Sequence, residues 1–148
     1  MRDIKRAAVL GSGVMGAAIA AHIANCGIPS LMLYTVLPDA KDSADTAKRN
    51  AVAAKAKAAL LKAKPAPAYA PEVLDLIAIG NFDDDMARIK DADLVIEVVK
   101  EDLAIKKKIF AEVVKHRRPG SIVATNTSGI SVASMTEPMD ADMKAHFL

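Results

Sequence analysis

Short apolar runs recur along this chain and are separated by longer segments of mixed polarity. Runs at 7–10, 31–34, 77–79, 94–99 and 122–125 are too short for ordinary helices and predict five β-strands. The run at 94–99 is continuous and rich in β-branched residues, which is typical of a strand buried on both faces of a sheet.

The segments between these runs predict helices, at 14–25, 39–64, 83–89 and 103–116. The regular alternation of strand and helix predicts an α/β fold in which helices cover both faces of a doubly wound parallel sheet. We therefore expect residues 1–148 to form a single domain.

The first predicted helix suggests a buried face. Met15, Ile19, Ile23 and Cys26 recur at helical spacing, and Gly27 follows where helices commonly end. We expect Cys26, the single cysteine of the chain, to behave as a small buried apolar residue. One cysteine excludes an internal disulfide and a cysteine-based metal cluster, and no metal site is expected.

Composition narrows the functional classes. Apolar residues make up 52% of the chain and aromatic residues 3%, which predicts an aliphatic core. A formal net charge of +2 is too small to indicate nucleic-acid binding. The apolar run at 7–10 is far too short for a signal peptide or a membrane span. These features predict a soluble domain in the reducing cytoplasm.

A glycine-rich segment between the first strand and the first helix carries the candidate chemistry. Its sequence is Gly11-Ser12-Gly13-Val14-Met15-Gly16. In this position Gly11 permits a tight turn, Gly13 lets the backbone approach a pyrophosphate, and Gly16 lets the helix pack on the strand. The helix N-terminus adds free N–H groups and a partial positive charge. The segment predicts a dinucleotide site of the Rossmann type, and the alternative is a glycine-rich loop without a ligand.

Three separated segments, 5–16, 92–103 and 125–130, together resemble the NAD-binding domain of the 3-hydroxyacyl-CoA dehydrogenases. Residues 60–67 with 80–82 are similar to the subgroup found in multifunctional fatty-acid oxidation proteins. The resemblance implies NAD as cofactor and reversible hydride transfer to or from the C3 carbon of a 3-hydroxyacyl-CoA in β-oxidation. Acyl-chain length and fusion to an enoyl-CoA hydratase domain stay open.

The resemblance also implies roles for individual residues. Glu101 and Lys106 match an acid and a base that line the nicotinamide side of the cofactor site. Ser128 matches a serine that contacts the substrate near the reacting oxygen, and Asn126 precedes it in the same cofactor-facing loop. The alternative for the first pair is a surface ion pair. The alternative for the second pair is turn chemistry, in which the side chains bond to nearby backbone.

The first departure from the family pattern is Tyr34, at the end of the second predicted strand. NAD-binding folds commonly place Asp or Glu there to accept hydrogen bonds from the ribose hydroxyls. A phenol can bond a ribose hydroxyl or stack on adenine, but it is not an anionic acceptor. We expect Tyr34 to contact the cofactor and to weaken the binding of NAD, without favouring NADP.

The second departure is the expected position of the catalytic base. The family places its histidine in a Gly-x-His-Phe-Phe-Asn-Pro segment, and the sequence ends just before that segment. His146 lies in the lead-in, and His22 and His116 are expected to be structural. We also expect a helical C-terminal domain, through which acyl-CoA binds, to be missing. The isolated domain is then inactive, and a homodimer is a candidate assembly.

Two other functions stay open at this point. The chain could be a non-catalytic Rossmann module whose nucleotide site has decayed, which Tyr34 favours and the intact glycines disfavour. It could also belong to a different dehydrogenase of 2- or 3-hydroxy acids, which the residues carrying the family resemblance disfavour.

Overall fold

The computed structural model describes residues 3–148 and shows one five-stranded parallel sheet in the order β3-β2-β1-β4-β5. The strands are β1 (Ala7–Leu10), β2 (Ser30–Tyr34), β3 (Ile77–Asn81), β4 (Leu94–Glu97) and β5 (Ile122–Thr125). The predicted α/β fold with a parallel sheet is confirmed, and each expected strand is present.

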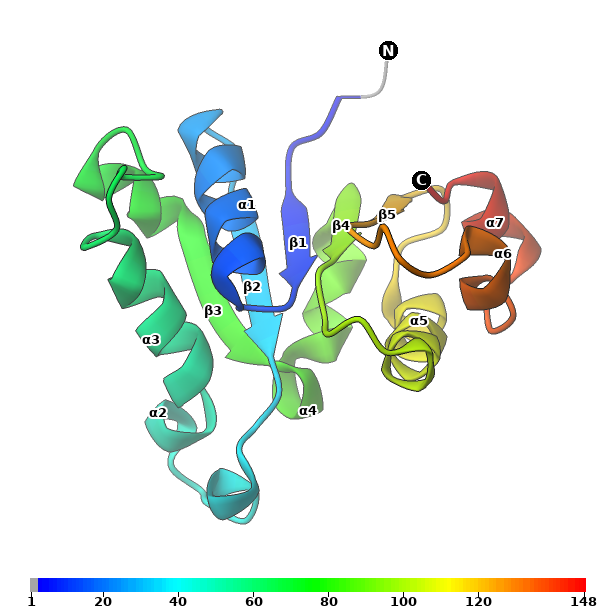
Figure 1. Ribbon diagram of the computed structural model, residues 1–148, viewed down its shortest axis with the longest axis horizontal. Helices are drawn as coiled ribbons and strands as arrows, with labels where there is room; N and C mark the ends of the chain where they lie inside the picture. Colours follow the sequence, from blue (N-terminus) through cyan, green and yellow to red (C-terminus); the bar gives the residue numbers. More distant parts are fainter. Residues whose placement is uncertain (1–2) are drawn as a thin grey trace.

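Helices cover both faces of this sheet (Figure 1). The α-helices are α1 (Val14–Asn25), α2 (Thr46–Arg49), α3 (Ala51–Leu60), α4 (Phe82–Asp85), α5 (Leu103–His116), α6 (Val132–Met135) and α7 (Ala141–Ala145). Three 3-10 helices are η1 (Pro38–Ala40), η2 (Pro71–Leu76) and η3 (Met86–Asp91). None of the described helices is both long enough and apolar enough to cross a membrane.

The core has two parts, one on each face of the sheet. Successive side chains of β1 point to opposite faces of the sheet and so belong to different parts of the core. Ala7 and Val9 pack toward α1, while Ala8 and Leu10 pack toward α5. Every side chain of β1 is buried because the strand has a neighbour on each side and helices above and below it.

The buried face of α1 differs from the predicted one. Met15 is 55% exposed and Cys26 is exposed, so the expectation that both face the core is wrong. The helix instead packs on the sheet through small residues: Gly16, Ala17, Ala20, Ala21 and Ala24, together with Ile23. Alanine side chains let the helix axis approach the strands closely, and the spacing of the larger residues does not reveal this.

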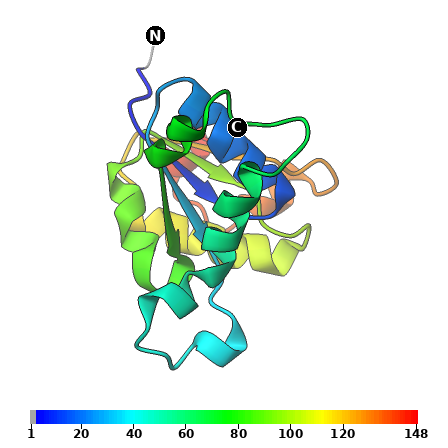
Figure 2. The ribbon, with the colours of Figure 1, turned by 90° about the vertical axis from the view of Figure 1, so that its left-hand side faces the viewer.

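The predicted long helix at 39–64 is broken. It contains η1, then α2, then α3, and Asp45 accepts a hydrogen bond from the N–H of Ala47 to begin α2. Asn50 interrupts the α-helical backbone with φ −95° and ψ 7°. In both views the segment with η1 and α2 projects beyond the carboxyl ends of the strands (Figures 1 and 2).

Two further differences concern short helices. The predicted helix at 83–89 divides into α4 and η3, and Asn81 caps α4 by accepting hydrogen bonds from the N–H groups of Asp83 and Asp84. Helices α6 and α7 were not predicted, because each is too short to show a helical period.

Candidate functional site

The predicted site residues gather at one edge of the sheet, because the strands are parallel and their carboxyl ends meet there. The glycine-rich turn follows β1, Tyr34 ends β2, Glu101 lies between β4 and α5, and residues 126–128 follow β5. Segments far apart in the sequence therefore surround the same edge.

At two positions of the turn, contacts within the domain require glycine. Gly11 has φ +134°, and a Cβ there would overlap the carbonyl of Val98. A Cβ on Gly16 would overlap the carbonyl of Gly11, so the helix can approach the turn only without that side chain. The close contact at Gly16 is thus with the turn, whereas we predicted a contact between the helix and the strand.

Gly13 is different. A Cβ added there would meet no atom of the described residues within 4 Å, so packing within the domain does not require glycine. Gly13 is also the N-cap of α1 and provides no side-chain cap. The start of α1 thus combines open space beside Gly13 with N–H groups that no side chain caps, and we call this region the cradle. Such an arrangement suits a phosphate.

Polar and apolar surfaces meet at this cradle. The Ser12 hydroxyl is buried and has no hydrogen-bond partner among residues 3–148. Beside the turn lies a groove of about 570 Å³ between α1 and α3, lined by Ser12, Gly13, Val14, Ala17, Ala18, Val52, Lys55, Ala56, Ala59, Leu60, Ala63, Pro65 and Pro67. The cradle therefore offers backbone donors next to apolar surface.

A buried ion pair lies at the carboxyl end of β4. Glu97 is 0% exposed and Lys106 1% exposed, and Nζ of Lys106 lies 2.8 Å from Oε1 and 3.0 Å from Oε2 of Glu97. Glu97 Oε1 also accepts a 2.6 Å hydrogen bond from the Val99 N–H, and Oε2 accepts a 2.5 Å bond from the Thr125 hydroxyl. Each carboxylate oxygen of Glu97 therefore accepts two hydrogen bonds.

Glu101 has a separate set of contacts. Its Oε1 accepts a 2.9 Å hydrogen bond from the Gly129 N–H, and its Oε2 accepts a 3.4 Å bond from the Thr127 hydroxyl. Glu101 therefore holds the loop after β5 and does not pair with Lys106. The alternative of a surface ion pair between Glu101 and Lys106 is wrong, because the buried Glu97 provides the partner.

The side chains of Asn126 and Ser128 are exposed at the top of that loop. Within residues 3–148 neither side chain has a hydrogen-bond partner, whereas the Thr125 hydroxyl accepts a 3.2 Å bond from the Thr127 N–H. The alternative role expected for Asn126 and Ser128, a side-chain hydrogen bond to nearby backbone, is thus taken by Thr125. The two predicted residues keep free polar groups for a ligand.

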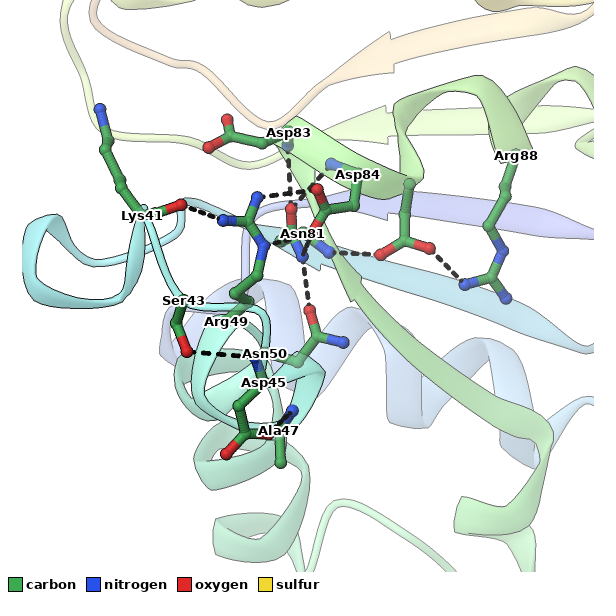
Figure 3. A network of polar contacts seen from close by, with 11 residues as sticks. Lys41, Ser43, Asp45, Ala47, Arg49, Asn50, Asn81, Asp83, Asp84 and Arg88 are labelled. Atoms are coloured by element: carbon green, nitrogen blue, oxygen red, sulfur yellow. Dashed lines mark hydrogen bonds and ion pairs between the residues drawn. The ribbon is translucent and has the colours of Figure 1, made fainter.

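Tyr34, at the end of β2, is half-buried and lies opposite Asn81 of β3. Asn81 Nδ2 donates to Asn50 at 2.7 Å and to Asp84 at 2.8 Å, and Arg49 donates two hydrogen bonds to the Asp84 carboxylate (Figure 3). This network fastens the segment after β2 to the end of β3.

Charge holds the same network together. The Arg49 hydrogen bond, assisted by Asn81, holds the pKa of the Asp84 carboxyl below its usual range. The same hydrogen bond raises the pKa of Arg49. Each of the three nitrogens of the Arg49 guanidinium donates one hydrogen bond within the protein, two to Asp84 and one to the Lys41 carbonyl.

The three histidines lie away from the exposed loop groups. His22 is exposed on α1, and His116 at the end of α5 lies 3.7 Å from Glu112. The Nδ1 atom of His146 lies 2.7 Å from the carbonyl oxygen of Asp142 on α7. None of these three provides a base at the carboxyl edge.

Sequence reasoning missed Glu97, Thr125 and Asn81. The signal for Glu97 was present: one acid within an otherwise apolar run, with Lys106 nine positions later. A charge placed in a buried strand requires a buried partner. The Asn81 contacts with Asn50 and Asp84 depend on tertiary structure and left no comparable pattern.

Comparison with known proteins identifies the family. Residues 6–148 match the family model described as "3-hydroxyacyl-CoA dehydrogenase, NAD binding domain". The chain belongs to this family. A probable 3-hydroxyacyl-CoA dehydrogenase of Bacillus subtilis is 50% identical over 157 aligned residues, which cover 99% of this chain. A putative fatty acid oxidation complex trifunctional enzyme of Rickettsia felis is 38% identical.

These relatives are much longer than the matched region. The aligned part is 20% of the Bacillus relative and 19% of the Rickettsia relative, so larger regions lie outside it. Among solved structures, 3-hydroxybutyryl-CoA dehydrogenase from Escherichia coli has a TM-score of 0.70 at 26% identity, covering 92% of this chain and 27% of that one. A diketoreductase has a TM-score of 0.73 at 29% identity, covering 100% of this chain and 50% of the other.

The family's cofactor is NAD, and the cradle agrees with it. The open position at Gly13, the start of α1 without a side-chain cap, and a buried Ser12 hydroxyl that has no partner among residues 3–148 are features that suit a diphosphate.

Proposed function

We propose that this chain is the cofactor-binding part of an enzyme that oxidises (S)-3-hydroxyacyl-CoA to 3-oxoacyl-CoA in fatty-acid β-oxidation. Bound NAD supplies the hydride acceptor. In this proposal residues 11–16 bind the pyrophosphate, Tyr34 lies against the adenosine ribose, and Glu101 and Asn126 line the nicotinamide side. Lys106, also expected there from the sequence, is 1% exposed and bound to Glu97, so it is assigned no cofactor contact. Ser128 donates its hydroxyl to the substrate oxygen.

The pairing of the last residues with β5 carries the proposal. Phe147 lies opposite Val123 in a parallel bridge, and the Thr125 N–H donates to the Leu148 carbonyl at 2.9 Å. This pairing extends the sheet beside β5, and β5 leads into the loop with the exposed Asn126 and Ser128 side chains. A general base supplied at this edge would reach a substrate held by Ser128.

Removal of that base typically costs about 10²–10⁴-fold in rate. Because none of the histidines in residues 3–148 lies at this edge, we expect residues 1–148 alone to oxidise NADH with acetoacetyl-CoA at a negligible rate. Turnover by this chain within about tenfold of a full-length member of the family would contradict the need for a further base. Acyl-CoA contacts in a C-terminal region, a homodimer and a cytoplasmic location stay predictions.

Nucleotide binding tests the glycine cradle directly. Gly13→Val should leave the fold intact, because a Cβ there meets no atom of the described residues within 4 Å, and should abolish NADH binding by occupying the pyrophosphate position. Isothermal titration of NADH into both proteins measures this. Equal affinities would contradict the assignment.

A second candidate is a non-catalytic nucleotide-binding module, and Tyr34 favours it. This residue takes the position where an acid commonly binds the ribose, and its neighbour Asn81 is committed to other contacts. Inactivity of the full-length protein with retained NADH binding would support this function over the dehydrogenase.

A further inference from the structure

The carboxylate of Glu97 connects two segments that carry the proposed nicotinamide contacts. We propose that Glu97 is a positioning residue: through Thr125 it holds the loop of residues 125–129 in the shape that the nicotinamide end of NAD requires. This inference rests on the proposed function, in which the same loop faces the nicotinamide and the substrate.

Glu97 holds the loop from both its side chain and its backbone. The Thr125 hydroxyl donates to Glu97 Oε2 at 2.5 Å and accepts from the Thr127 N–H at 3.2 Å. The Asn126 N–H donates to the Glu97 carbonyl at 2.9 Å. The backbone around Asn126 is therefore held by Glu97 directly, through its carbonyl, and indirectly, through Thr125. The side chain of Asn126 is exposed.

The direction of each hydrogen bond follows from the groups that surround the Glu97 carboxylate. An ionised carboxylate only accepts, and the groups facing it are all donors: the Lys106 ammonium, the Val99 N–H and the Thr125 O–H. Because Thr125 must donate to Glu97, its lone pairs are left to accept from Thr127. Lys106 provides the compensating charge, and its Nζ is also 3.4 Å from the Val99 carbonyl.

The other end of the loop has its own anchor. Glu101 accepts from the Gly129 N–H, so the loop is held at residues 125–127 by Glu97 and at residue 129 by Glu101. Ser128 lies between these anchors with an exposed side chain. Loss of the inner anchor should therefore disturb the nicotinamide side while the glycine cradle stays in place.

The test replaces Thr125 with valine, which has nearly the same shape and leaves the Glu97–Lys106 ion pair intact. NADH and ADP-ribose are titrated into each protein, because ADP-ribose lacks the nicotinamide. We expect Thr125→Val to weaken NADH binding about tenfold and to change ADP-ribose binding less than about twofold. A loss of stability alone would lower both affinities together.

Two variants complete the design. Thr125→Ser retains the hydroxyl and should restore NADH affinity to within about threefold of wild type. Thr136→Val is the matched control, since that hydroxyl donates to the Ala133 carbonyl outside the loop, and both affinities should be unchanged. Should Thr125→Val fail to fold, the same split between NADH and ADP-ribose is expected for Thr125→Ala.

The outcomes separate this inference from the proposed function. Equal affinities of wild type and Thr125→Val for NADH, or an equal loss for both ligands, would overturn the role of Glu97 alone. A wild-type chain that binds neither NADH nor ADP-ribose would overturn the proposed function and this inference with it.

Discussion

Two polar networks lie at the same edge of the sheet, and they differ in their contact with water. The Glu97–Lys106–Thr125 network closes the β4–β5 side, and its ion pair, Glu97 with Lys106, is buried. The Arg49–Asp84–Asn81 network closes the β2–β3 side, and the Asp84 side chain is 45% exposed (Figure 3). Both fasten a loop to the end of a strand with charged groups.

The difference shows how burial determines what a polar contact contributes. Water stabilises the partner that remains when an exposed pair is broken, so the cost of breaking it is low. A buried charge that loses its partner cannot be solvated, so the same change is expensive. The β4–β5 side should therefore be rigid, and the segment after β2 should adapt more easily.

Removal of the buried cation should have the largest effect. Lys106→Met leaves the Glu97 carboxylate without its counter-charge and should lower the free energy of unfolding by about 3–5 kcal/mol. Urea unfolding followed by circular dichroism measures this. Lys115→Met is the control on the same helix: its ion pair with Glu112 is exposed, so a change below about 0.5 kcal/mol is expected. Equal losses for both variants would remove the distinction between the networks.

The glycine turn between the two networks gives the next largest effect. Gly16→Ala forces a Cβ against the Gly11 carbonyl and should destabilise the domain by about 1–3 kcal/mol, although alanine normally favours a helix. At Gly13 an added methyl group meets no atom of residues 3–148, so Gly13→Ala should shift the midpoint of thermal unfolding far less than Gly16→Ala does. The reverse order of stability would show that the helix can move away from the turn.

Tyr34 tests whether the β2–β3 side binds the ribose. Tyr34→Asp should tighten NAD binding by about 1–2 kcal/mol, because a carboxylate can accept charge-assisted hydrogen bonds from the ribose hydroxyls. NADP should gain nothing, since its 2′-phosphate is repelled by the new charge. Calorimetric titration of both cofactors decides this, and equal gains would mean that Tyr34 lies elsewhere relative to the ribose.

The exposed network should give the smallest effect, and the effect should depend on pH. Arg49 holds the pKa of Asp84 below its usual range, so the stabilisation is fully present above the unfolded pKa of about 3.9. It is lost as the pH falls through the lower folded pKa. Asp84→Asn should unfold at a slightly lower temperature than wild type at pH 7, and the two should converge in acid. A difference that persists at low pH would exclude the ion pair as its cause.

Much of the fold could be predicted from the sequence because it depends on local patterns. The apolar runs predicted each strand, and the glycine turn between β1 and α1 predicted the cradle. The helix at 39–64 was predicted incorrectly because composition does not reveal the interruption at Asn50. Cys26 was misplaced because the small residues of α1, rather than its larger ones, contact the sheet.

The candidate site divides in the same way. The amino-acid sequence was enough to predict which residues follow each strand, and parallel strands bring those positions to one edge. The hydrogen-bond partners became clear only from the packed elements: Lys106 pairs with Glu97 and not with Glu101, and Glu101 binds the Gly129 N–H. The physical reason is that periodicity reports burial of apolar surface along one element. A hydrogen bond between elements depends on distances of a few ångströms, which are fixed only when the elements pack.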